Sequence, residues 1–174
     1  SRPMDAPSAP QSSLSPALVD VAAGRVALVA GAAALLIPAI YLTEAGTHQT
    51  GVFTNLNRLA LLAAVLACVG VFALRRTGAA PASTVLRLGL AVEVLVAFAL
   101  SLVETTADPD AGSIAGRSAV AMWIMANCAA VPSLPRWTLP TVLLAASAWP
   151  AAYAVNAAAG TAHAGLWPYL QWVA

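Results

Sequence analysis

Long stretches without any charged residue constrain this chain more than any other feature of its sequence. One of them covers residues 26–43 and reads VALVAGAAALLIPAIYLT, without an acid or a base. A helix of that length reaches across most of the hydrocarbon core of a bilayer, which is about 30 Å thick. The sequence therefore predicts an α-helix that spans a membrane.

The low content of charged residues also indicates that lipid surrounds the chain. Of the 174 residues, 60% are hydrophobic and only 9% are charged, whereas a soluble domain carries roughly 25% charged residues. A water-soluble surface cannot be built from so few charges, so lipid is the expected surroundings. The net charge of +1 arises from near balance between acids and bases, and nucleic-acid binding therefore has no electrostatic basis here.

Further apolar segments follow the first at regular intervals. We expect an all-α fold, a polytopic transmembrane helical bundle of five spans plus a partial sixth, within residues 16–174. Residues 1–15 mix Ser, Pro, Ala and Gln and are expected to form a disordered cytoplasmic tail. Ser15 and Pro16 supply a helix cap and a first-turn proline. The expected spans are 26–43, 57–74, 84–103, 118–131 and 139–158, with the partial one at 166–174.

The last apolar segment is too short to cross a membrane, which takes about twenty residues. It has two interpretations. Either the chain ends in an interfacial stub, or the sequence belongs to a longer protein that continues the span. We favour the longer protein, because a native terminus rarely falls inside an apolar run.

Arginine placement predicts the orientation, because short loops rich in Arg stay on the cytoplasmic side. On an alternating five-span path, only Arg58 and Arg117 fall on the opposite side. The N-terminus is therefore expected in the cytoplasm, and the chain in the inner (cytoplasmic) membrane as a multi-pass protein. The arginines expected on the cytoplasmic side are Arg2, Arg25, Arg75, Arg76, Arg87 and Arg136.

Glu93 is the one acid well inside an expected span. A carboxylate in lipid costs several kcal/mol unless it is paired, protonated or hydrated. Counted at 1.5 Å per residue from the cytoplasmic ends, Glu93, Asn127 and Ser147 reach depths that agree within about 6 Å. They are candidates for an intramembrane polar layer. Glu93 would be either a proton or ligand site, or an acid that fixes helix packing.

The sequence shows no motif of a catalytic, metal-binding or phosphate-binding site. His48 and His163 are expected in loops on the non-cytoplasmic face. Two separate solvated histidines are a simpler interpretation than a shared metal site. No nucleophile elbow, phosphate-binding glycine loop or HExxH spacing occurs. We therefore expect no catalytic residues, no metal and no cofactor. Aromatic residues near span ends are expected to anchor the chain at the headgroup level: Trp137, Trp167, Tyr169 and Trp172.

Part of the chain resembles the membrane region of bacterial serine/threonine protein kinases. The residues that carry the resemblance are LRLGLAVEVLVAFALSLVE (86–104), AVAMWIM (119–125), VPSLPR (131–136) and LPTVLLAASAWPAA (139–152). In that family such a region precedes a cytoplasmic kinase domain. The chain departs from the family's catalytic pattern, because it contains no glycine-rich loop, catalytic lysine or HRD-type segment.

The resemblance implies a membrane anchor or sensor region of a bacterial signalling protein, non-catalytic in itself. A second hypothesis is an accessory structural subunit that packs against a larger membrane complex, photosynthetic or respiratory. A small transporter half is a third, supported by Glu93 alone. The expected partners are the lipid bilayer and other membrane helices, including those of a second copy of the chain.

Overall fold

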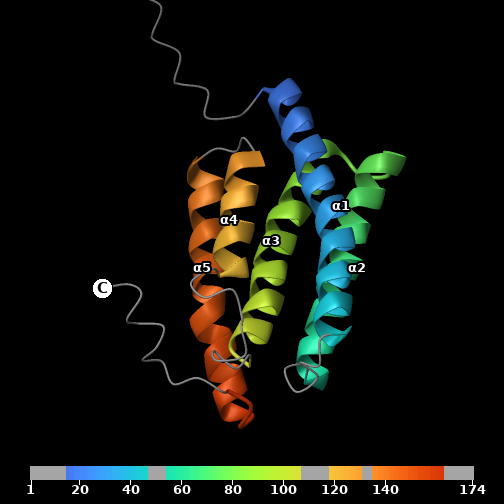
Figure 1. The fold of residues 1–174 in the computed structure, drawn as a ribbon. Coiled ribbons are helices and arrows are strands. Elements are labelled where there is room, and N and C mark those ends of the chain that lie inside the picture. The colour runs from blue at the N-terminus through green and yellow to red at the C-terminus, as the bar shows by residue number, and fades with distance from the viewer. Residues whose placement is uncertain (1–14, 47–53, 107–117, 131–134, 163–174) are drawn as a thin grey trace, which may run out of the picture.

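The computed structural model describes residues 15–46, 54–106, 118–130 and 135–162. Within these ranges the regular elements are all α-helices, which confirms the all-α class (Figure 1). They are α1 (Pro16–Gly46), α2 (Asn55–Thr77), α3 (Ala82–Glu104), α4 (Ala119–Ala130) and α5 (Pro135–Ala158). The expected tail at 1–15 lies outside the described residues except for Ser15, and the partial span at 166–174 lies outside them entirely.

The helix ends follow local capping chemistry. At the start of α1, the backbone N–H of Leu18 donates to Ser15 Oγ at 3.4 Å. At the start of α2, the N–H of Asn57 donates to Thr54 Oγ1 at 3.2 Å. These side chains satisfy backbone donors that have no partner in the first turn. Gly78 ends α2 with φ of 68°, a left-handed conformation that glycine adopts without strain.

Four of the five described helices are long and apolar enough to cross a membrane: α1, α2, α3 and the part of α5 from Thr138 to Ala158. α4 has 12 residues, about 18 Å of helix at 1.5 Å per residue. This is short of the hydrocarbon thickness of about 30 Å. The described part of the chain is thus all-helical, with four helices that could cross a membrane.

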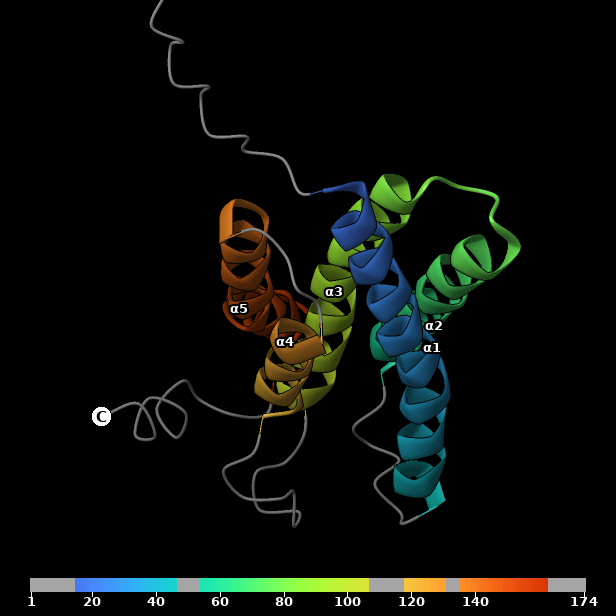
Figure 2. The same ribbon diagram turned by 90° about the horizontal axis from the view of Figure 1, so that it is seen from above.

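α3 occupies the centre of the bundle. Figures 1 and 2 show it between the pair α1 and α2 on one side and the pair α4 and α5 on the other. It makes contacts with all four of these helices. Successive helices run in opposite directions (Figure 1). α3 therefore connects the two helix pairs.

Small side chains face inward and large apolar ones face outward. The helices approach through buried alanines, including Ala145, Ala148 and Ala152 on α5. Leucines instead cover the outside of α1, α2 and α5 and are more than half exposed: Leu28, Leu35, Leu36, Leu42, Leu59, Leu62, Leu66, Leu139, Leu143 and Leu144. A soluble protein buries such residues, whereas lipid is as apolar as leucine and leaves helix association to close packing.

Two glycines make room for side chains of neighbouring helices. A Cβ at Gly89 of α3 would overlap Cγ1 of Val26 on α1. A Cβ at Gly31 of α1 would lie 2.9 Å from Cδ2 of Phe72 on α2. Because glycine has no side chain, Val26 packs directly against the backbone of α3 and Phe72 against the backbone of α1. α1 is thereby held against both α2 and α3.

Candidate functional site

Glu93 lies in the interior of the bundle, on α3. Its side chain is 5% exposed, and Oε1 has no hydrogen-bond partner among the described residues. Arg87, six residues earlier on the same helix, is exposed. The ion pair found among the described residues joins Arg75 to Asp20. Glu93 is therefore a carboxyl group enclosed by helices without a basic side chain paired to it.

α4 is attached to α3 at the level of Glu93. The indole Nε1 of Trp123 donates a hydrogen bond of 3.0 Å to the backbone carbonyl of Glu93. One turn later on α4, Asn127 is also buried, and its Nδ2 donates to the carbonyl of Trp123 at 3.0 Å. Trp123 thus contributes to this polar cluster, although it is not among the residues expected from the sequence to form the polar layer.

Ser147 lies outside this cluster. It is exposed on α5, and its Oγ donates to the carbonyl of Leu144 on its own helix at 2.8 Å. Counting residues from the membrane surface places a side chain at a depth but does not say which face of the helix carries it. The polar residues that the structure brings together at this depth are Glu93, Trp123 and Asn127.

The other candidate residues fall where the structure gives no side-chain description. His48, His163, Trp167, Tyr169 and Trp172 lie outside the described residues. Trp137 belongs to the first turn of α5, and its side chain is also outside the description. Within the described ranges no group of three or more His, Cys, Asp or Glu side chains could hold a metal ion.

A second buried polar cluster, which was not predicted from the sequence, lies where α3 ends. Asn57 on α2 is fully buried, and its Nδ2 donates a 2.8 Å hydrogen bond to Thr106 Oγ1. α3 ends at Glu104, and Thr105 and Thr106 follow directly after it. The bond fixes the start of α2 to the end of α3.

Asn156 on α5 makes the corresponding connection from the other side. It is fully buried, and its Nδ2 donates to Thr105 Oγ1 at 2.7 Å and to the carbonyl of Leu102 at 2.9 Å. Its Oδ1 accepts from Thr161 Oγ1 at 3.3 Å. We call Asn57, Thr105, Thr106 and Asn156 the asparagine cluster. It joins α2, α3 and α5 at one end of the bundle.

Glu104, the last residue of α3, caps the start of α4. Its carboxylate accepts hydrogen bonds from Ser118 Oγ at 3.1 and 3.3 Å, from the backbone N–H of Ala119, and from that of Val120 at 3.3 Å. A carboxylate at this position satisfies unpaired N–H groups and complements the positive end of the helix dipole. Glu104 lies just outside the expected span 84–103, and its capping role depends on a partner segment 14 to 16 residues away.

At the opposite end of the bundle, α1 and α2 are joined by an ion pair. Arg75 Nη1 lies 2.8 Å from Asp20 Oδ1, and both side chains are partly exposed. Exposed pairs of this kind contribute little to stability, because water and dissolved salt screen the attraction. Arg75 therefore orients the surface more than it stabilises the fold.

Comparison with known proteins gives no relative: no protein-family model, no curated protein and no solved structure matches the chain. The geometry of the described residues consists of a buried acid in mid-bundle, polar helix connections at one end, and arginines with a surface ion pair at the other.

Proposed function

We propose that this chain is the membrane anchor and sensor region of a bacterial signalling protein, a serine/threonine kinase, and is non-catalytic in itself. In this proposal the bundle has five spans, with the short α4 as the fourth, and residues 166–174 begin a sixth that leads to the cytoplasmic effector. The partial resemblance over residues 86–152 and the central position of α3 support it.

The central position of α3 carries the proposal. The asparagine cluster ties its end to α2 and α5, Glu104 ties it to α4, and Gly89 brings it against α1 near its other end. Closely packed interfaces shift between discrete arrangements rather than deform continuously. A ligand or force at the end of the bundle that carries the asparagine cluster would thus move α3 as a unit relative to the opposite, arginine-rich end, which carries Arg75 and Arg76.

The test uses the native protein isolated from its own membranes with an antibody against this chain. We expect a polypeptide much heavier than the 17.6 kDa of the present sequence, one that transfers phosphate from ATP to serine or threonine. A native mass of 17.6 kDa in a stable membrane complex would refute the kinase proposal and support the accessory subunit.

The orientation that we propose places the N-terminus and the arginine-rich end in the cytoplasm, with the protein in the inner membrane. Ala79 and Ala159 are exposed at opposite ends of the bundle. In a Cys128→Ser background, where the remaining Cys68 is buried, Ala79→Cys should react with an impermeant maleimide only from the cytoplasmic side. Ala159→Cys should react only from the other side, and the reverse pattern would overturn the orientation.

One observation favours the accessory structural subunit as the second candidate. α4 has only 12 residues, and its outward side chains Met122 and Met125 are exposed, as are Leu139, Leu143 and Leu144 on α5. A helix of about 18 Å in a hydrocarbon core of about 30 Å leaves apolar surface that a neighbouring subunit could cover.

A further inference from the structure

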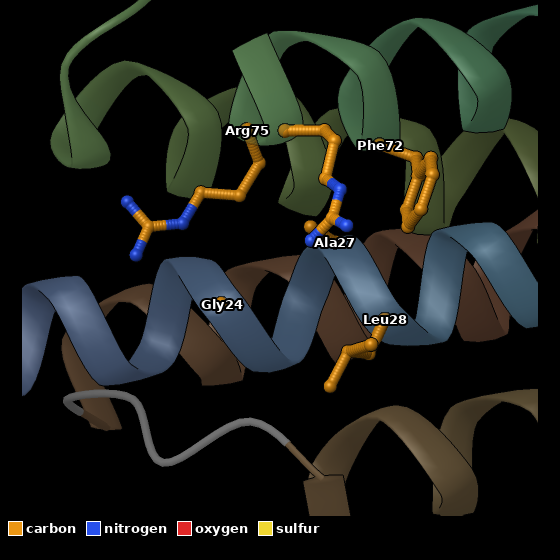
Figure 3. A pocket seen from close by; sticks show the side chains of 6 residues that line it. Gly24, Ala27, Leu28, Phe72 and Arg75 are labelled. Carbon is orange, nitrogen blue, oxygen red and sulfur yellow. The ribbon is translucent and has the colours of Figure 1, made fainter. Parts of the chain in front are cut away.

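A hollow opens between α1 and α2 at the arginine-rich end of the bundle. It has a volume of about 260 Å³. Figure 3 shows Arg75 and Phe72 on α2 across from Gly24 and Ala27 on α1. The residues that line it are Gly24, Ala27, Leu28, Phe72, Arg75 and Arg76. Small residues on α1 leave the space, and a Cβ at Gly24 would meet only Arg75 Nη2, at 4.0 Å.

The polar part of the hollow is positively charged. Arg75 is held by Asp20 at 2.8 Å, and a second bond of 3.5 Å runs from Arg75 Nη2 to the carbonyl of Asp20. Arg76 is exposed, and the described residues place no carboxylate against it. Two guanidinium groups and one carboxylate leave a net charge of +1. Because the guanidinium group presents several N–H donors in one plane, it suits phosphate oxygens.

The side chains that line the hollow also change from polar at its mouth to apolar deeper in the bundle. On α2, Phe72 lies one helical turn closer to the bundle centre than Arg75 and Arg76. On α1, Leu28 lies one turn deeper than Gly24. Leu28 is 67% exposed and Phe72 is 39% exposed. A phospholipid has the same order of groups, with a phosphate at the surface and an acyl chain beneath it.

We propose that this hollow binds the phosphate of an anionic phospholipid, with Arg76 and Arg75 contacting the headgroup and Leu28 and Phe72 contacting the acyl chain. Basic pockets between membrane helices bind such headgroups through this combination of charge and shape. The binding is independent of the signalling role, because any anchored form of the chain would retain it.

The test uses the purified full chain in zwitterionic detergent and counts bound molecules by native mass spectrometry. The probes are short-chain phosphatidylglycerol, short-chain phosphatidylcholine and inorganic phosphate. We expect saturable one-to-one binding of phosphatidylglycerol, weakened about fivefold by Arg76→Gln, since each basic residue contributes about that factor at a membrane surface. Gly24→Leu, which fills the hollow, should abolish one-to-one binding.

The matched control is Arg58→Gln. Arg58 is an exposed arginine in the first turn of the same helix, at the opposite end of the bundle, so its replacement removes the same charge away from the hollow. Equal weakening by Arg58→Gln, or unchanged binding in Arg76→Gln, would overturn the site. Saturation by inorganic phosphate at the same concentration would overturn the lipid assignment. Arg76 is exposed, so its variant decides the outcome even if Gly24→Leu fails to fold.

Discussion

Replacing Gly89 with alanine is expected to destabilise the bundle by about 1 to 3 kcal/mol, the usual cost of overfilling a well-packed interior. The added methyl group would overlap Cγ1 of Val26 on α1. Val26 cannot move aside easily, because it is 5% exposed and a β-branched side chain in a helix has one strongly preferred rotamer. The helices α1 and α3 must therefore separate. Unfolding in mixed micelles with increasing sodium dodecyl sulfate measures the change.

Gly70→Ala is the matched control. Gly70 lies within α2, also a helix of 23 residues, and a Cβ there would meet nothing within 4 Å. Alanine is favoured over glycine in helix interiors by about 1 kcal/mol, so this variant should be neutral or slightly more stable. Adding Val26→Ala to Gly89→Ala should restore much of the lost stability, since it removes the overlapping atom. Equal stability of the two glycine variants would show that α1 and α3 do not meet at Gly89.

The positions of the long helices followed from the sequence, because uncharged runs of this length form helices wherever lipid surrounds them. α2 and α3 cover the ranges expected as the second and third spans and extend a few residues beyond them. α1 begins at Pro16 as its cap predicted and continues to Gly46, past the expected end at residue 43. Polar residues at a helix end did not mark its boundary, because the backbone can continue into the interface.

The sequence could not predict which face of each helix points into the bundle. A helix in lipid is apolar all round, so hydrophobic periodicity does not separate its inner side from its outer side. Glu93, Asn127 and Ser147 share a depth by counting, yet Ser147 is exposed whereas Asn127 is buried. Their rotation about the helix axis depends on packing partners that are distant in the sequence.

The asparagine cluster was missed for a related reason. Asn57 and Thr106 are 49 positions apart, and Asn156 and Thr105 are 51 apart. The available signal was local: an asparagine near the end of each of two apolar segments, and a Thr-Thr pair directly after a third. Polar residues at such places commonly join helices in membranes, but the sequence alone does not specify which ones pair.

Asn156→Leu is expected to lower the stability of the bundle by about 1 to 3 kcal/mol, the cost of leaving a buried polar group unsatisfied. Leucine has a similar size but cannot donate to Thr105 Oγ1 or to the carbonyl of Leu102, which Asn156 reaches at 2.7 and 2.9 Å. Ser147→Ala is the control on the same helix. Its hydroxyl is exposed and donates to the carbonyl of Leu144 within α5, so its loss should change stability by less than about 0.5 kcal/mol.

A double-mutant cycle with Thr105→Val separates the hydrogen bond from the loss of packing. If Asn156 stabilises the end of α3 through Thr105, the two substitutions together should cost less than the sum of each alone. The expected difference is about 0.5 to 1.7 kcal/mol, the range found for hydrogen bonds between membrane helices. Additive effects would mean that the two side chains act independently. The asparagine cluster could then not transmit a movement of α5 to α3, and the central argument for a sensor would fail.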